Sequence, residues 1–410
     1  MEHKVSLRGQ NLPGSPIRKL ASVADAAKAK GRKIYHLNIG QPDIETPPKA
    51  IEKVRNDKQS IIAYGPAQGN LSLRKVYAKY YQKFNAQFHA DDIIVTTGAS
   101  EAILFALNAT CNPGDEVIIP EPFYANYIGF AAFCAVHVKA ITGRIEDEFA
   151  LPSPDAFRRK INKKTKAILL CNPSNPTGKV YDKVALKKII DLAIEHDLFI
   201  IVDEVYKEFC YGKSFESITQ FDQAINHVIV LDSISKIFSS CGARIGFLAT
   251  RNVPLRNAIL KACQMRLCPP YFGQIIAEEA FLSMDEYLPP VKKEYEIRRA
   301  KVFDLVSKIE GVQCYLPDGA FYLIAELPVE DADDFCKWLL SDFEYEGNSV
   351  MLSPASGFYA NKTLGKRQVR IAFVLNVEDL EKAITCLEKG LQQYKTIEIP
   401  SVSSNINSGK

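Results

Sequence analysis

The chain has 410 residues, more than a single hydrophobic core usually supports, which indicates two domains or one large α/β domain with an appendage. Hydrophobic residues make up 47% and charged residues 24% of the chain, as is typical of a soluble globular protein. The 51 basic and 48 acidic residues leave a net charge of only +3, which argues against nucleic acids or membrane surfaces as partners.

The ten cysteines form no CxxC pair and have no metal-ligand spacing with histidine, so we expect reduced, mostly buried thiols and no metal site. The first residues, Met1 to Arg8, contain no apolar signal region. No stretch of the sequence has the apolar length that a membrane-spanning helix needs. These features together predict a cytoplasmic protein.

Strands and helices alternate between about Asp91 and Thr250, a pattern typical of a parallel α/β sheet. The strand segments are continuous apolar runs, as the burial of both faces of a sheet demands. The predicted strands are Ile93–Thr97, Glu116–Pro120, Ala167–Cys171, Leu198–Asp203, His227–Leu231 and Arg244–Ala249. Helical spacing of apolar residues predicts helices over Ser100–Cys111 and Lys183–His196.

After about Pro289 the pattern changes to helices mixed with short strands, which predicts a smaller α+β domain. Two strand-like segments flank a turn at Leu316–Gly319, and Val369–Val374 is a further predicted strand. The predicted helices are Lys292–Ile309, Asp331–Phe343 and Val377–Tyr394. The polar end of the chain predicts a disordered tail over residues 396–410.

Lys236 follows the predicted strand 227–231, lies between hydroxyl side chains and precedes Arg244 by eight residues. A buried lysine is disfavoured unless it is paired or used chemically, because desolvation favours the neutral amine, which can attack a carbonyl. The alternative is a surface-loop lysine whose arginine neighbour is coincidental. This segment alone favours neither interpretation.

Two further polar motifs follow predicted strands, at the positions where open parallel sheets bind ligands. The first, Thr97-Gly-Ala-Ser-Glu101, opens a helix whose free N–H groups would bind an anion, although Ser100 could be only an N-cap. The second, Asn172-Pro-Ser-Asn-Pro-Thr-Gly178, predicts a rigid loop that could aim the amide of Asn175 at an anionic oxygen. A plain turn is the alternative for this second motif.

Asp203 ends an apolar strand, and Tyr206 lies on the turn that follows it. A buried carboxylate is costly without a cation, so Asp203 requires a cationic partner unless it is a helix N-cap. The motifs together supply an amine, a carboxylate, a phenol, an amide and two anion sites, the second at Arg244. A phosphorylated heteroaromatic aldehyde suits this set, with its phosphate at the helix end and Arg244, its ring nitrogen at Asp203 and its aldehyde at Lys236. Pyridoxal 5′-phosphate has this chemistry.

From roughly Ser15 to Tyr394 the chain resembles the pyridoxal-phosphate-dependent class I/II aminotransferases of the aspartate aminotransferase fold type. The motifs that carry the resemblance stand in family order. They are Asn38-Ile-Gly-Gln-Pro-Asp43, Tyr64-Gly-Pro-Ala-Gln-Gly69, Thr97-Gly-Ala-Ser-Glu101, Pro122-Phe-Tyr124, Asn172–Gly178, Asp203-Glu-Val-Tyr206, Ser233-Ile-Ser-Lys236, Arg244-Ile-Gly246 and Val369-Arg-Ile-Ala372.

The resemblance implies an α/β fold with a large domain, built on a mostly parallel sheet between helices, and a smaller α+β domain. We expect the large cofactor-binding domain over residues 49–289 and the small domain over residues 1–48 and 290–395. The implied activity is the transfer of an amino group from an L-amino acid to a 2-oxo acid such as 2-oxoglutarate, with pyridoxal 5′-phosphate as the cofactor.

The resemblance also implies roles for single residues. Lys236 would be the Schiff-base lysine and would move the substrate's proton, and Asp203 would keep the ring nitrogen protonated. Arg370 would clamp the substrate's α-carboxylate with help from Asn175 and the backbone of Gly40, the alternative being a strand-end arginine in a surface salt bridge. The other implied cofactor contacts are stacking of Tyr124 on the ring and hydrogen bonds from Asn175 and Tyr206 to the phenolic oxygen of the cofactor. The phosphate would be held by Ala99, Ser100, Ser233, Ser235 and Arg244.

Tyr64 is implied to reach the phosphate of a neighbouring subunit, so the active unit would be a homodimer. Some dicarboxylate-specific relatives carry a lysine where this chain has Ser100, so that contact to a second carboxylate is missing. Our hypothesis is that Arg266 binds the second carboxylate of aspartate or glutamate across the interface, and an arginine on a helix surface is the alternative. An aspartate-like donor is therefore favoured.

The sequence leaves two other functions open. Carbon–sulfur and related lyases use the same scaffold and keep the lysine, the aspartate and the arginine, so the sequence separates them poorly from aminotransferases. A non-enzymatic, cofactor-binding regulator is the other alternative. It is disfavoured because the sequence has no basic helix-turn-helix extension.

Overall fold

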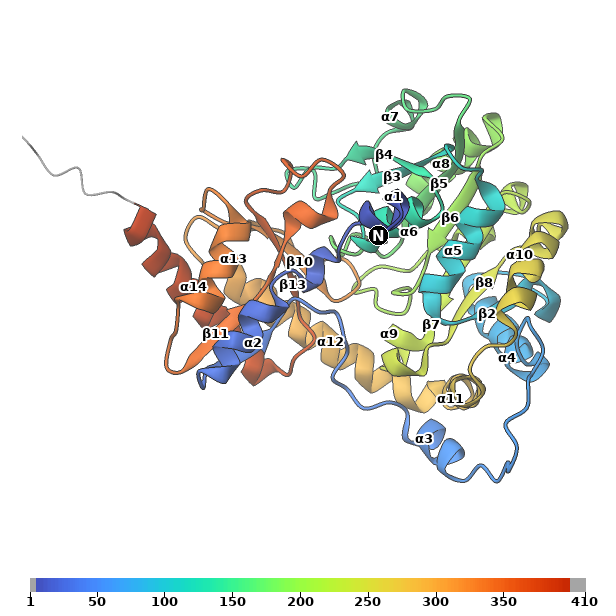
Figure 1. Cartoon of the computed structure of the whole chain (residues 1–410), viewed down its shortest axis with the longest axis horizontal. Coiled ribbons are helices and arrows are strands. Elements are labelled where there is room, and N and C mark those ends of the chain that lie inside the picture. Colours follow the sequence, from blue (N-terminus) through green and yellow to red (C-terminus); the bar gives the residue numbers. More distant parts are fainter. Residues whose placement is uncertain (1–4, 399–410) are drawn as a thin grey trace, which may run out of the picture.

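The computed structural model of the chain describes residues 5–398. Its larger part, on the right of Figure 1, is built on a seven-stranded sheet with the strand order β2-β8-β7-β6-β5-β3-β4. The strands are β2 (Ile93–Thr96), β3 (Glu116–Glu121), β4 (His137–Thr142), β5 (Thr165–Cys171), β6 (Phe199–Asp203), β7 (Val228–Ser233) and β8 (Gly246–Ala249). Only β8 runs antiparallel to its neighbours β2 and β7. The expected mostly parallel sheet is confirmed.

Helices cover both faces of this sheet. Successive strand residues point to opposite sides, and since strands such as β2 and β7 are buried along their length, both faces need a covering layer. Ile93 and Val95 belong to one buried cluster, with residues of α4 (Leu71–Tyr81), α8 (Lys183–Glu195) and α11 (Tyr271–Leu282). Ile94 belongs to a second cluster on the other face. Its helices are α5 (Gly98–Thr110), α6 (Asn126–Phe133) and α10 (Val253–Arg266). The sheet therefore lies between two helical layers.

The smaller part of the molecule contains an antiparallel sheet in the order β12-β13-β10-β9 and a parallel pair of strands, β1 and β11. These strands are β1 (Lys33–His36), β9 (Gln313–Cys314), β10 (Tyr322–Glu326), β11 (Asn348–Met351), β12 (Ser353–Pro354) and β13 (Gln368–Ala372). The helices around them are α2 (Ala21–Ala29), α13 (Ala332–Ser341) and α14 (Val377–Glu398). The smaller α+β domain is confirmed.

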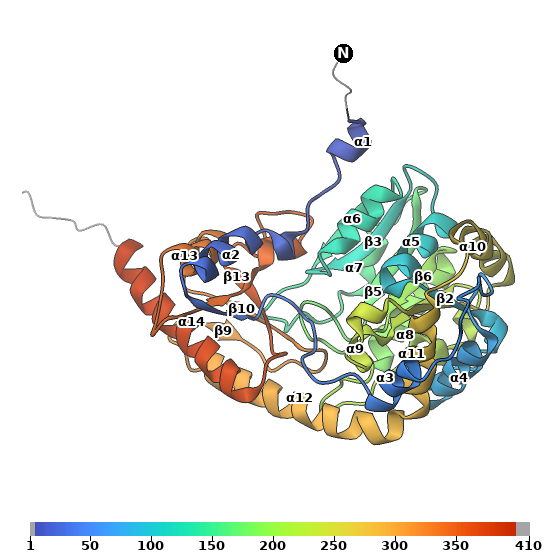
Figure 2. The same cartoon turned by 60° about the horizontal axis from the view of Figure 1, so that its bottom comes forward.

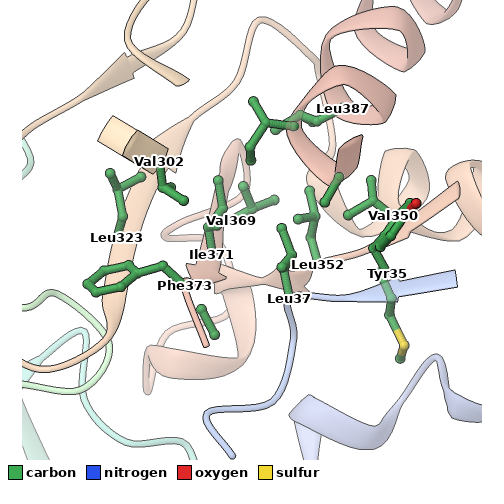
Figure 3. Packing of buried hydrophobic residues seen from close by; sticks show 14 of the residues in the cluster. Tyr35, Leu37, Val302, Leu323, Val350, Leu352, Val369, Ile371, Phe373 and Leu387 are labelled. Atoms are coloured by element: carbon green, nitrogen blue, oxygen red, sulfur yellow. The ribbon is translucent and has the colours of Figure 1, made fainter. Parts of the chain in front are cut away.

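Residues from both ends of the sequence share the core of this smaller part (Figure 3). Tyr35 and Leu37, near the N-terminus, pack in one buried cluster with Val350, Leu352 and Ile371. This packing agrees with an N-terminal segment that joins the C-terminal part of the chain. The domain boundaries that we expect from the sequence stay a prediction.

Helix α12 (Met284–Val306) runs along the bottom of Figure 2 and links the two parts. It is continuous through Pro289 and Pro290, where the sequence predicts a change of domain. Shorter helices are α1 (Leu7–Gln10), α3 (Pro48–Arg55), α7 (Pro154–Arg158) and α9 (Ile234–Ile237). None of the helices between residues 5 and 398 combines the length and the apolar character needed to cross a membrane.

Four details of the predicted elements differ from the structure. The predicted helix Lys292–Ile309 is part of α12, which begins at Met284 and ends at Val306. Strand β4 was not predicted, because it lies at the edge of the sheet and only Ile141 of its six side chains is buried. Strand β8 begins at Gly246 rather than at Arg244, because Arg244 has the left-handed backbone angle φ of 55°. Of the predicted tail, residues 396–398 continue α14, and residues 399–410 lie outside the described residues.

Candidate active site

A cavity of about 510 Å³ lies at the carboxyl ends of β6 and β7, where residues of the smaller part also reach it. The predicted site residues that line it are Gly40, Ala99, Ser100, Tyr124, Asn175, Asp203, Tyr206, Ser233, Ser235, Lys236, Arg244 and Arg370. Tyr64 does not line it and is 81% exposed. The structure thus brings together residues that lie more than 300 positions apart in the sequence.

Lys236 is half-buried and lies on the short helix α9, directly after β7. Ser233 is the N-cap of this helix, since its Oγ accepts a hydrogen bond from the backbone N–H of Ser235 at 3.1 Å. The Nζ atom of Lys236 donates to the carbonyl oxygen of Gly40 at 2.7 Å and lies 3.9 Å from Cys241 Sγ. The amine therefore lines the cavity and is not on an exposed surface loop.

Asp203, the last residue of β6, is only 8% exposed and lines the same cavity. Its Oδ2 accepts from the hydroxyl of Tyr127 at 2.8 Å, and its Oδ1 accepts from the backbone N–H of Val205 at 3.2 Å. Burial raises the pKa of Asp203 to about 6, although these hydrogen bonds oppose the shift. The nearby amine of Lys207 binds Asp232 instead. Among the described residues Asp203 therefore has no ion-pair partner, and none of their side chains is the cationic partner expected from the sequence.

The candidate anion site is the start of α5, which places Ala99 and Ser100 in its first turn. Thr97 occupies the N-cap position, so the alternative that Ser100 is only an N-cap is wrong. The guanidinium of Arg244 lies against this helix end, since a Cβ atom added to Gly98 would be 2.4 Å from its Nη2. Free helix N–H groups beside a guanidinium suit a phosphate.

Arg370, on β13, is only 1% exposed although it is charged. Its Nη1 donates to Asn175 Oδ1 at 2.9 Å, and its Nη2 donates to the carbonyl oxygen of Asn38. The ring of Tyr322 lies 4.4 Å from the guanidinium carbon. Burial lowers the pKa of Arg370 from its ordinary value, and Nε has no hydrogen-bond partner among the described residues. The surface salt bridge considered as an alternative is therefore wrong, and the guanidinium is available to an anion in the cavity.

Comparison with known proteins gives the family. The family model for aminotransferases of class I and II matches residues 32–387 of the chain. The chain belongs to the class I and II aminotransferases. Aspartate aminotransferase of Pyrococcus abyssi is 31% identical over 390 residues, which cover 93% of this chain and 96% of the relative. Aromatic-amino-acid aminotransferase 2 of Thermococcus litoralis is 31% identical over 393 residues, which cover 93% and 97%.

A solved structure of alanine aminotransferase from Pyrococcus furiosus superposes on this aminotransferase with a TM-score of 0.87 at 29% identity, covering 95% of this chain and 100% of the other. The fold of the family is thereby confirmed. The names of the three relatives give aspartate, aromatic amino acids and alanine as substrates. Membership of the family therefore does not determine the donor of this aminotransferase.

Enzymes of this family use pyridoxal phosphate, and the cavity fits that group. Asp203 is a buried carboxylate without a cation, which suits a protonated ring nitrogen. Gly98 and Gly246 let β8 and Arg244 approach the helix end closely, because a Cβ atom on Gly246 would lie 2.4 Å from the carbonyl carbon of Gly98 and one on Gly98 would lie 2.4 Å from Arg244 Nη2. Arg244 and the first turn of α5 then suit a phosphate, and Lys236 supplies an amine.

Tyr127 and Tyr322 contact the predicted site residues but were not predicted from the sequence. Tyr127 donates to Asp203, as described above, and Tyr322 OH lies 2.7 Å from Tyr206 OH in a hydrogen bond. A Cβ atom on Gly40 would be 1.8 Å from Tyr322 OH, so only glycine fits there. A signal for Tyr127 existed, because it follows Tyr124 by three residues at the start of a helix. Tyr322 has no local motif.

Arg266 is not an exposed helix-surface arginine, and its hypothesised contact with a substrate across a subunit interface stays a prediction. Its Nη1 donates to Glu101 Oε2 at 3.0 Å, and its Nη2 donates to the carbonyl oxygen of Ala67 at 2.9 Å. The side chain is 16% exposed, so it does not lie on a helix surface. Because its guanidinium already forms an ion pair with Glu101, whereas that of Arg370 has no acidic partner among the described residues, Arg266 is the less suited of the two to a carboxylate of the substrate.

Proposed function

We propose that this aminotransferase binds pyridoxal 5′-phosphate in the cavity and transfers an amino group from an L-amino acid to a 2-oxo acid such as 2-oxoglutarate. An aspartate-like donor is favoured. One observation carries the proposal: Lys236, the unpaired carboxylate of Asp203, the Arg244 anion site and the unpaired guanidinium of Arg370 line a single cavity. Few ligand pairs other than this cofactor and an amino acid require all four groups.

When bound, pyridoxal phosphate supplies an aldehyde for the substrate's amine and a protonated ring that draws electrons from the substrate's Cα. Asp203 holds the proton on the ring nitrogen, and Tyr127 orients the carboxylate that does so. Lys236 lies beside the carbonyl of Gly40 and carries the proton to and from the substrate's Cα. Arg370 orients the substrate by its α-carboxylate, with its free Nε available to donate.

We also propose that the active unit is a homodimer. Apolar side chains that are between 43% and 82% exposed lie on two segments around Ile61, Tyr64 and Met265, which we call the 61–71/265–272 surface. The exposed residues of this surface are Ile61, Ile62, Tyr64, Leu71, Met265, Leu267 and Phe272. Hydrogen bonds from Arg266 to Ala67 and from Asn70 N–H to Gln274 join the segments. An apolar patch of this kind supports an interface between subunits, from which Tyr64 would reach the partner's cavity.

Absorption spectroscopy and an amine-transfer assay test the proposal. The purified protein with added pyridoxal phosphate should show the visible band of the bound cofactor and should form amino acid product from a 2-oxo acid. Lys236→Ala should abolish transfer. Lys179→Ala is the matched control, because Lys179 is also largely buried, at 14% exposure of the side chain, but lies in an ion pair with Glu148 outside the cavity.

Two results would contradict the proposed function. Full transfer activity in Lys236→Ala would exclude the lysine from the reaction. Release of pyruvate and ammonia from the donor without a 2-oxo acid acceptor would instead indicate a lyase on the same scaffold.

A further inference from the structure

One charged side chain of the cavity has no role in the proposed function. The charged side chains that line the cavity are Arg18, Asp203, Lys236, Arg244 and Arg370. The cofactor and the α-carboxylate of the substrate account for all of these except Arg18. The guanidinium of Arg18 is exposed and has no hydrogen bond, ion pair or ring contact within residues 5–398. A guanidinium at the wall of a substrate cavity, without an acidic partner in its own chain, suits an anionic group of the ligand.

The backbone around Arg18 is held in place by contacts that its two neighbours, Ile17 and Lys19, make with other segments. Arg18 ends a short 3-10 helix, Pro16–Arg18, and the carbonyl oxygen of Ile17 accepts a hydrogen bond from Asn38 Nδ2 at 3.3 Å. The next residue, Lys19, forms an ion pair with Asp333 of α13 at 2.8 Å. The segment is therefore fixed to the smaller part of the molecule, and the two adjacent cations have different surroundings: Lys19 is paired, and Arg18 lines the cavity.

The same contacts connect the segment of Arg18 to Arg370, which the proposed function assigns to the substrate, and not to Arg244. Asn38 connects the two arginines, because its side chain donates to the carbonyl of Ile17 and its own carbonyl accepts from Arg370 Nη2. The anion site of Arg244 belongs to a different element, at the start of α5. A ligand whose α-carboxylate binds Arg370 therefore has Arg18 as the available cation for a second anionic group.

We propose that Arg18 binds the side-chain carboxylate of the amino donor and makes the enzyme selective for dicarboxylates of the aspartate and glutamate type. The inference rests on the proposed function, which supplies the position of the α-carboxylate. It replaces Arg266, whose Nη atoms are engaged by Glu101 and Ala67, as the residue that recognises the second carboxylate.

Arg18→Gln tests the inference through the difference between aspartate and asparagine, two donors of the same shape that differ in side-chain charge. The loss of a hydrogen-bonded charge pair should lower kcat/KM for aspartate roughly 10- to 100-fold, mainly through KM, and should leave asparagine within about threefold of the wild type. Arg18→Lys should restore part of the lost kcat/KM for aspartate, because lysine returns the positive charge but not the planar guanidinium that binds a carboxylate through two N–H groups.

Binding of a non-reacting ligand gives a second readout. Succinate, a dicarboxylate without an amine, should bind the cofactor-loaded wild type more tightly than butyrate, and Arg18→Gln should remove this preference. Lys19→Gln is the matched control, since Lys19 is the neighbouring cation but is paired with Asp333, and it should retain the preference.

The outcomes separate the inference from the proposed function. Equal losses for aspartate and asparagine in Arg18→Gln, or no loss for either, would overturn the role of Arg18 while the cofactor band and amine transfer remain. A wild-type protein that binds no pyridoxal phosphate would overturn the proposed function and the inference with it. A loss confined to aspartate, together with the loss of the succinate preference, supports the inference.

Discussion

Asp203 shows how one residue can be costly for the fold and necessary for the site. Burial raises its pKa to about 6, and the hydrogen bonds from Tyr127 and from the N–H of Val205 only partly offset the shift. Between the ordinary pKa of an aspartate, roughly 4, and this raised value, the folded chain binds more protons than the unfolded chain. The stability contributed by this carboxyl is therefore present below about pH 4 and is lost as the pH rises through about 6.

Asp203→Asn should therefore stabilise the cofactor-free chain at neutral pH while weakening the binding of the cofactor. A shift of about two pKa units corresponds to a gain of roughly 2–3 kcal/mol in the free energy of unfolding at pH 8, and no gain is expected at pH 4. Urea unfolding over this pH range measures the difference. The exposed Asp155, replaced in the same way, is the control and should show no such pH dependence. An equal gain in the free energy of unfolding at pH 4 and at pH 8 would contradict the raised pKa of Asp203.

The residues of the site were predictable to different degrees, for physical reasons. Asp203 ends one parallel strand and Lys236 follows the next, and because such strands end at one edge of the sheet, their sequence positions predict their proximity. Tyr322 reaches the site only because β10 of the smaller part packs against the larger part, and Arg18 only because Asn38 fixes its segment. No local pattern contains that information. The family resemblance supplied Arg370, whose position also depends on how the two parts meet.

At the scale of elements, a buried ion pair joins the ends of the two strands that carry the site. Lys207, four residues after Asp203, binds Asp232, four residues before Lys236, and both side chains of the pair are only 2% exposed. The hydroxyl of Tyr77, on α4, also donates to Asp232 at 2.8 Å. The pair therefore connects the turn after β6 to the end of β7 and supports the relative positions of the site's carboxylate and amine.

Lys207→Met should destabilise the fold strongly, because it leaves the carboxylate of Asp232 buried without a cation. A loss of roughly 3–5 kcal/mol in the free energy of unfolding is expected, and the double variant Lys207→Met/Asp232→Leu should recover much of it. Chemical denaturation of the single and double variants measures both effects. The half-exposed pair Lys187–Asp191 is the control, since its removal should cost less than about 1 kcal/mol. A double variant no more stable than the single one would contradict this account.

The elements predicted best are those whose burial is uniform. Strands such as β7 are buried along their whole length and appear in the sequence as continuous apolar runs. The edge strand β4 carries His137 and Lys139 and has no such run. In α12, Pro289 and Pro290 indicate a boundary, yet buried residues on both sides of them, including Leu288 and Val291, hold the helix together. Tertiary packing outweighs the local preference of proline there.

At the scale of the whole molecule, two segments cross between the larger and smaller parts. One is α12, and the other is the segment that follows Gly40. Asp43, in this segment, forms an ion pair with Arg298 of α12. Arg298 also donates to the carbonyl oxygen of Val374, in the smaller part. The wall of the cavity near Lys236 and Gly40 is thus connected to the segments that position the two parts relative to each other.

The proposed dimer gives the last prediction. Ile61 lies on the 61–71/265–272 surface and is 77% exposed, so Ile61→Asp should not disturb the fold of a single chain. In a dimer the same aspartate would be buried without a cation, which should weaken association by several kcal/mol. Light scattering coupled to size-exclusion chromatography should therefore show a dimeric wild type and a shift of the variant towards the mass of one chain. Amine transfer should fall in parallel if Tyr64 contributes to the partner's cavity.

Val184→Asp, on α8 and also exposed at 65%, is the control and should remain dimeric. A monomeric wild type with full activity would contradict the dimer, because its cavity would then be complete without a partner.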